Sequence, residues 1–235
     1  MLESIHLINF KCFADEKIPL RPLTVLSGVN GMGKSTVLQS LLVLRQSIIS
    51  NTIANEGALI NGPLVSLGAA DDVLHDNAQD EECIEIVIET DTGDKYAYSF
   101  QCVKSSNTLP NTDNRSQPNE INILSGTKFF YLTAERTGPR TSFPFTDYEL
   151  GKYNPIGNSG EYSSYILSRN ERKKIGTEKL KHKKQIILDL RAQVEAWMSE
   201  LGQKIQIHTI EHPKMDMVGM EFSFVRDGLP SMNYR

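Results

Sequence analysis

Several features of membrane and secreted proteins are missing from this sequence of 235 residues. It contains no run of eighteen apolar residues, so a membrane-spanning helix is not expected. Its N-terminus lacks the basic and apolar segments of a secretory signal. The three cysteines, Cys12, Cys83 and Cys102, have no metal-ligand spacing, which favours free buried thiols in a reducing cytoplasm. The net charge of -4 argues against a protein that coats nucleic acid generally. A cytoplasmic globular protein without a membrane partner is therefore expected.

The N-terminal fifth of the chain predicts a hairpin, a strand and a helix. Residues 4–20 contain two short segments of alternating polarity, which favour an antiparallel hairpin. Residues 23–27 form a compact apolar run between Pro22 and Gly28, as is typical of a buried central strand. Residues 34–50 carry a broad apolar stripe at helical spacing. The order is that of a strand, a glycine-rich loop and a helix, and the first 50 residues form one predicted block.

The rest of the chain predicts further antiparallel strands and an inserted helical arm. The predicted segments are a hairpin over 83–103, a mobile loop over 104–120, a buried strand over 128–132, a long irregular stretch over 133–160, a helical arm over 161–202 and a hairpin over 204–225. In the arm, a basic stretch leads into a helix whose apolar face runs from Ile187 to Leu201, with Gly202 as its C-cap.

Residues 28–35 fit the phosphate-binding pattern G-x-x-x-x-G-K-[S/T] at every position. Glycines allow the backbone N–H groups to converge on phosphate oxygens, and the following helix N-terminus favours anions. Lys34 supplies a positive charge to the β- and γ-phosphates, Ser35 supplies a hydroxyl to Mg²⁺, and Thr36 reaches the α-phosphate. The predicted cofactors are ATP and Mg²⁺. The predicted nucleotide-binding residues are Gly28, Asn30, Gly31, Met32, Gly33, Lys34, Ser35 and Thr36.

Two observations narrow the class of nucleotide-binding protein. A small-molecule kinase or GTPase usually begins with the strand of the phosphate loop, whereas here a hairpin precedes it. The guanine-reading pattern N-K-x-D is also missing from the sequence, which argues against GTP.

Three blocks, residues 5–13, 20–28 and 30–36, resemble the start of the SMC/RecF/OLD group of ABC-class ATPases. Within that group the sequence is most similar to bacterial ATPases of anti-phage defence islands, including Septu-type ATPases. Residues 61–68, 131–140 and 156–161 also resemble that subgroup. The resemblance implies an α/β P-loop NTPase fold: the N-terminal part of an ABC-class head, with an antiparallel β subdomain and a helical insertion.

The resemblance also implies roles for residues outside the phosphate loop. Lys11 occupies the place of a basic residue that lies near the bound phosphates in relatives, although a solvated turn lysine is the alternative. Asn30 would help to place the attacking water or the γ-phosphate. Glu135 and Arg136 stand where relatives carry nucleotide-sensing residues, and an ion pair between them is the alternative.

Two elements that relatives use for hydrolysis are not recognisable in the sequence: an LSGGQ-like signature and an apolar strand ending in Asp-Glu. Residues 124–127 mimic the signature but are predicted to be a turn. Residues 186–189 mimic the acidic strand but lie in surroundings of helical period. The chain is therefore expected to stop before both elements, to bind ATP weakly and to hydrolyse it poorly. A homodimer or a partner would supply the second head, and whether the gene continues past Arg235 stays open.

The basic stretch offers a candidate DNA contact through Lys181, Lys183 and Lys184, with a solvated helical arm as the alternative. The leading hypothesis is a nucleotide-driven switch in a DNA-linked complex of repair or anti-phage defence, with a nuclease as a candidate partner. The alternatives are a truncated non-catalytic nucleotide-binding module and a transporter-type ABC ATPase.

Overall fold

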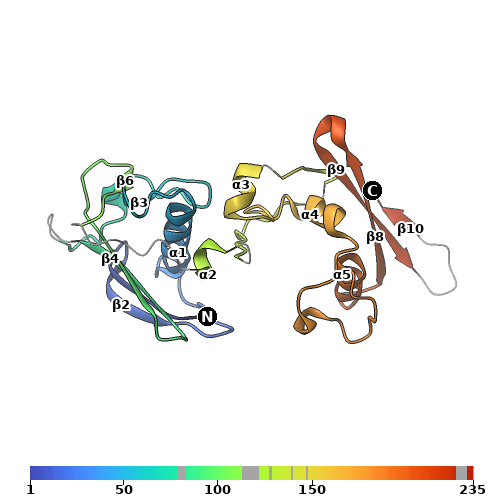
Figure 1. Cartoon of the computed structure of the whole chain (residues 1–235), viewed down its shortest axis with the longest axis horizontal. Coiled ribbons are helices and arrows are strands. Elements are labelled where there is room, and N and C mark those ends of the chain that lie inside the picture. The colour runs from blue at the N-terminus through green and yellow to red at the C-terminus, as the bar shows by residue number, and fades with distance from the viewer. Residues whose placement is uncertain are drawn as a thin grey trace. The chain divides into compact units, whose positions relative to one another are not determined.

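The computed structural model describes residues 1–78, 83–112, 122–126, 129–138, 140–146, 148–225 and 232–234. The chain divides into two compact units, Met1–Phe129 and Phe130–Arg235, coloured blue to green and yellow to red in Figure 1. Among the described residues, no helix combines the length and apolar character needed to cross a bilayer.

Unit 1 contains a four-stranded antiparallel sheet with the strand order β2-β1-β4-β5. The strands are β1 (Leu2–Phe10), β2 (Phe13–Pro19), β4 (Ile84–Thr90) and β5 (Lys95–Phe100). Both hairpins expected from the alternating polarity are found, because alternate side chains such as Ile5, Leu7 and Ile86 are fully buried.

Helix α1 (Lys34–Ile49) belongs to the same core and begins where the sequence predicts. Its apolar stripe is interrupted by three consecutive polar residues, Arg45, Gln46 and Ser47, which are all fully buried. The Gln46 amide Nε2 donates to the carbonyl oxygen of Leu59 at 2.6 Å, and the Ser47 hydroxyl accepts from the Leu59 N–H at 2.8 Å. The helix thus anchors surrounding loops through side-chain hydrogen bonds as well as apolar contact.

Short elements complete unit 1. Strand β3 (Ala58–Leu59) pairs with β6 (Thr108–Leu109), η1 covers Ala70–Asp72, and α2 covers Asn122–Ser125. Leu124 and Ser125 therefore end a short helix rather than form the predicted turn, whereas Thr127 lies outside the described residues. The predicted mobile loop over 104–120 is wrong at Thr108–Leu109, which form β6 with Leu109 fully buried, and residues 113–120 of it lie outside the described residues.

Unit 2 is built around strand β9 (Met217–Val225), which pairs antiparallel with three other strands. The partners are β8 (Lys204–His212), β7 (Ser142–Pro144) and β10 (Met232–Tyr234). The expected hairpin over 204–225 is found, with a short turn, η3 (Pro213–Met215), between its strands. The helices of unit 2 are α3 (Tyr148–Tyr153), α4 (Ser163–Asn170), η2 (Glu178–Leu180) and α5 (Leu190–Ser199).

Two predicted buried strands are wrong. Residues 23–27 form no strand, and Leu23 and Val25 are 83% and 78% exposed. Residues 129–132 also form none, and Phe130 is exposed, while Lys128 lies outside the described residues. Among the described residues, neither segment has a neighbouring strand to accept its backbone hydrogen bonds, and an apolar run without a partner strand is not a stable strand.

The predicted helical arm over 161–202 is also corrected. Its two helices, α4 and α5, are separated by a largely irregular segment with only the short turn η2, and Asp189 is the N-cap of α5. Residues 186–188 precede that helix, so the helical surroundings assigned to them are wrong. Ile187 and Leu201 lie outside α5 and are exposed, and the C-cap is Glu200 rather than Gly202. The stretch over 133–160, predicted to be irregular, contains β7 and α3.

Candidate functional site

The glycine loop leads into the N-terminus of α1. Gly28, Gly31 and Gly33 have φ values of 148°, 85° and 82°, which side chains larger than hydrogen adopt only with strain. Gly33 is the N-cap, and no side chain among the described residues caps the helix there. The N–H groups of the first turn therefore remain available to an anion, and the helix dipole favours negative charge at this position.

Lys34 is folded back onto the loop that precedes it. Its ammonium group donates to the carbonyl oxygen of Gly28 at 2.9 Å and to that of Val29 at 2.7 Å. These carbonyls hold the positive charge within the loop. A phosphate oxygen would offer a negatively charged acceptor in place of a neutral one, and such charge-assisted hydrogen bonds are about twice as strong.

The remaining loop residues differ in their access to solvent. Asn30, Met32 and Ser35 are exposed, so the Ser35 hydroxyl is free of the core. Thr36 is buried, and its hydroxyl accepts a long contact from the Cys12 thiol at 3.9 Å. The predicted reach of Thr36 toward an α-phosphate therefore competes with its packing against the hairpin.

The turn between β1 and β2 lies against this loop. A Cβ atom placed on Gly33 would come within 2.6 Å of both the Cys12 sulfur and the Phe13 Cζ atom. Cys12 is exposed rather than buried as expected, Cys83 and Cys102 are only partly buried, and none of the three cysteines forms a disulfide. Lys11 sits in the same turn with φ of 52°, and its N–H donates to the carbonyl oxygen of Val73 at 2.7 Å. The contact of Cys12 and Phe13 with the loop was missed from the sequence, because nothing in the local pattern indicates it.

Glu135 and Arg136 lie in unit 2 and are both exposed. No ion pair joins these two described residues, so that alternative is not found. Their segment is fixed by a loop twenty residues later: the Thr133 N–H donates to Asn158 O at 2.8 Å, and the Thr137 N–H donates to Ser159 O at 2.9 Å. Two blocks, 131–140 and 156–161, are thus brought together.

Asn154 is the buried residue that organises this loop. Its Nδ2 donates to the carbonyl oxygens of Tyr131 at 2.7 Å and Gly157 at 2.9 Å. The Glu161 carboxylate accepts from both the N–H and the hydroxyl of Ser159. Burial opposes ionisation of Glu161, but the hydrogen bonds from its own backbone and from Ser159 prevail and lower its pKa.

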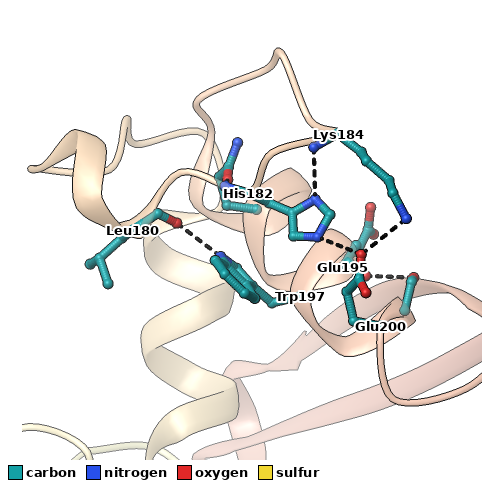
Figure 2. A network of polar contacts seen from close by, with 8 residues as sticks. Leu180, His182, Lys184, Glu195, Trp197 and Glu200 are labelled. Atoms are coloured by element: carbon teal, nitrogen blue, oxygen red, sulfur yellow. Dashed lines mark hydrogen bonds and ion pairs between the residues drawn. The ribbon is translucent and has the colours of Figure 1, made fainter.

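The basic stretch is arranged around one buried histidine, which the sequence analysis did not single out (Figure 2). The His182 backbone N–H donates to Gln193 Oε1 at 2.6 Å, and the ring lies edge-on to Trp197 with centroids 4.9 Å apart. Its Nδ1 accepts from the Lys184 N–H at 3.3 Å, so Nε2 carries the hydrogen that is donated to Glu200 at 3.1 Å. Its position between lysines gave no signal of burial.

The three lysines of the candidate DNA contact are not equivalent. Lys181 and Lys183 are exposed, whereas the Lys184 ammonium pairs with the Glu200 carboxylate at 3.2 Å. This bond to Lys184, followed by that from His182, lowers the pKa of Glu200. His182, Lys184 and Glu200, but not Lys181 or Lys183, border a polar cavity of about 530 Å³ in unit 2. Among the described residues, no cluster of three or more histidine, cysteine or acidic side chains could hold a metal ion.

Comparison with known proteins relates the chain to an ATPase family and, over a short stretch, to a nuclease. A family profile described as the AAA ATPase domain matches residues 1–226, which is nearly the whole chain. A protein named OLD nuclease, from Thermus scotoductus, is 44% identical over 41 residues. That match covers 17% of this chain and 8% of the nuclease, so it concerns a small part of both proteins.

Proposed function

The chain belongs to the AAA ATPase domain family, and from this premise we propose that its glycine loop binds ATP with Mg²⁺. The observation that supports this most directly is the position of Lys34, with its ammonium group turned onto the loop and its helix uncapped by any described side chain. An uncapped helix N-terminus preceded by glycines of positive φ suits a phosphate chain.

Binding would require little rearrangement of the loop. Lys34 would exchange its two carbonyl acceptors for phosphate oxygens, and the exposed hydroxyl of Ser35 would face the metal ion. Bound Mg²⁺ would neutralise part of the phosphate charge. Lys11 would add a second positive charge from the adjoining turn, and exposed Asn30 would line the outer side of the loop.

We further propose that the chain works as a nucleotide-driven switch in a DNA-linked complex of repair or defence. The family and the partial similarity to a protein named as a nuclease support this context. Turnover would then require groups from a second head, supplied by another copy or by a partner. Glu135 and Arg136 are exposed and held by a well-bonded loop, so they are available as nucleotide-sensing residues.

The proposed DNA contact uses the exposed lysines of unit 2. Lys181 and Lys183 project from the segment that His182 anchors, while Lys184 is partly neutralised by Glu200. We expect Lys181→Gln and Lys183→Gln, each made singly, to weaken DNA binding and to reduce its salt dependence, because each phosphate contact releases counterions. Lys184→Gln is the internal comparison and should have the smaller effect. Equal effects of all three substitutions would contradict this assignment.

Nucleotide binding is tested by titrating the purified chain with Mg²⁺-ATP in a calorimeter. Lys34→Ala should weaken binding at least about tenfold, since it removes a charged hydrogen-bond donor worth more than about 1.4 kcal/mol. Lys17→Ala is the matched control, because Lys17 is an exposed lysine on β2 that pairs with Glu89. Equal affinity of the Lys34 and Lys17 variants would refute the assignment. Titrations with DNA present would then separate a DNA-linked switch from a nucleotide-binding module.

A further inference from the structure

The turn between β1 and β2 has an unusual backbone. Asn9 and Lys11 both have positive φ values, 53° and 52°, although neither is glycine. Such a backbone conformation is strained for a residue with a side chain and persists only where surrounding structure determines it. Between them, Phe10 is fully buried in the core. The turn is therefore held in a conformation that the local sequence alone would not favour.

Three hydrogen bonds fix this conformation from neighbouring segments. The Asn9 carbonyl accepts from the His75 N–H at 3.1 Å, and the Asn9 side-chain amide donates to the Cys83 carbonyl at 3.2 Å. The Lys11 N–H donates to the Val73 carbonyl at 2.7 Å. Because both strained residues are hydrogen-bonded to segments outside the hairpin, the turn cannot change its conformation without breaking contacts with the rest of unit 1.

The tip of this rigid turn is in close contact with the last glycine of the phosphate loop. The Cys12 sulfur and the Phe13 ring occupy the space that a side chain on Gly33 would need, and both approach a Cβ position to 2.6 Å. The Cys12 sulfur also faces the Thr36 hydroxyl in the first turn of α1. Gly33 thus meets two demands at once: a positive φ and the absence of a side chain.

We propose that Cys12 and Phe13 are positioning residues of the phosphate loop, forming a rear wall that sets where Gly33 and the helix N-terminus stand. The proposal rests on nucleotide binding at this loop. It assigns the hairpin turn a role in holding the loop amides where phosphate oxygens would meet them. Preorganised donors bind an anion more tightly because they need no rearrangement on binding.

A double-mutant cycle tests the wall. Gly33→Ala should weaken Mg²⁺-ATP binding about fiftyfold in the natural turn, since the new methyl group meets both the strain of its φ and the wall. In a trimmed turn carrying Cys12→Ala and Phe13→Leu, which removes the two contacting atoms, the same substitution should cost only about fivefold, the share due to backbone strain. The trimmed turn alone should bind ATP several-fold more weakly than the natural one.

Controls separate this role from general stability. Glu16→Ala changes an exposed residue of β2 in the same hairpin and should neither weaken binding nor rescue Gly33→Ala. Circular dichroism checks that each variant is folded. Should the Phe13 substitution disturb the core, Cys12→Ala alone must still give part of the rescue.

Equal losses from Gly33→Ala in the natural and trimmed turns would overturn the positioning role while leaving nucleotide binding intact. Failure of the unsubstituted chain to bind ATP would instead remove the proposed function, and the positioning role with it.

Discussion

Arg45 is the buried residue whose substitution should be most informative about unit 1. It lies on α1 with no exposed surface, and its Nη1 donates to the carbonyl oxygens of Leu124 and Gly126. Its guanidinium group lies 4.4 Å from the centre of the Phe129 ring. Burial lowers the pKa of Arg45 from its ordinary value to about 10. The segment that ends unit 1 is therefore docked on the helix through a cation in the core.

The magnitude follows from two opposed effects. Burial disfavours the charged form of Arg45, and this is the cause of its lowered pKa. Hydrogen bonds to a charged donor contribute about 1.5–3 kcal/mol each, and a desolvated cation–π contact contributes about 2 kcal/mol. Arg45→Met removes both effects and leaves buried carbonyl groups short of a donor. We expect the free energy of unfolding to fall by about 2–4 kcal/mol.

Urea denaturation followed by circular dichroism measures this loss, and hydrogen exchange of residues 122–126 localises it. Gln39→Met is the matched control on the same helix. The Gln39 Oε1 is buried without a partner among the described residues, so its removal should be neutral or stabilising. Fluorescence of Trp197, the only tryptophan, reports on unit 2 instead. If Arg45→Met costs under about 0.5 kcal/mol, or no more than the control, the reasoning about the docked cation is wrong.

Three further variants test separate features. Gly57→Ala should reduce the free energy of unfolding by about 2–4 kcal/mol, seen as a lower melting temperature, because a Cβ at its φ of 107° would stand 2.0 Å from a backbone oxygen. Changing both Leu23 and Val25 to Ser should alter stability by under about 0.5 kcal/mol in urea denaturation, because both are exposed; a loss of several kcal/mol would indicate a buried strand. The bond from Lys184 lowers the pKa of Glu200 from 4.5, so Glu200→Gln should reduce stability at neutral pH. The difference in stability between Glu200→Gln and the parent should disappear as the pH falls through and below the lowered pKa of Glu200. Unfolding measured at a series of pH values would show this.

The hairpins and α1 could be predicted because their signals are local. In β4, alternation places Ile84, Ile86 and Ile88 on the buried face, and the partner strand follows after a tight turn. In α1, the apolar side chains at helical spacing all lie in one contiguous segment, so the helix can be predicted without reference to a partner. The glycine loop was predictable for the same reason, since its pattern of residues is contiguous.

The remaining features depend on partners distant in sequence. The buried state of Arg45 depends on carbonyl groups about eighty residues later, and that of His182 depends on α5. Neither residue type nor neighbours indicated burial. Residues 23–27 were wrongly expected to be buried. Their apolar composition predicts a strand, but no strand among the described residues lies beside them to pair with. Pairing and burial are properties of two segments, and a pattern in one of them cannot decide either.

The two sides of the glycine loop are consequently held very differently. On its N-terminal side, residues 23–27 form no strand and leave apolar side chains in solvent. On its C-terminal side, α1 is fixed by a continuous core and by buried polar anchors such as Gln46. The loop's position must therefore be set from the helix and from the turn behind Gly33, rather than from the segment that enters it. This asymmetry is why substitution of Cys12 or Phe13, unlike substitution of Leu23 or Val25, should change how well the loop binds phosphate.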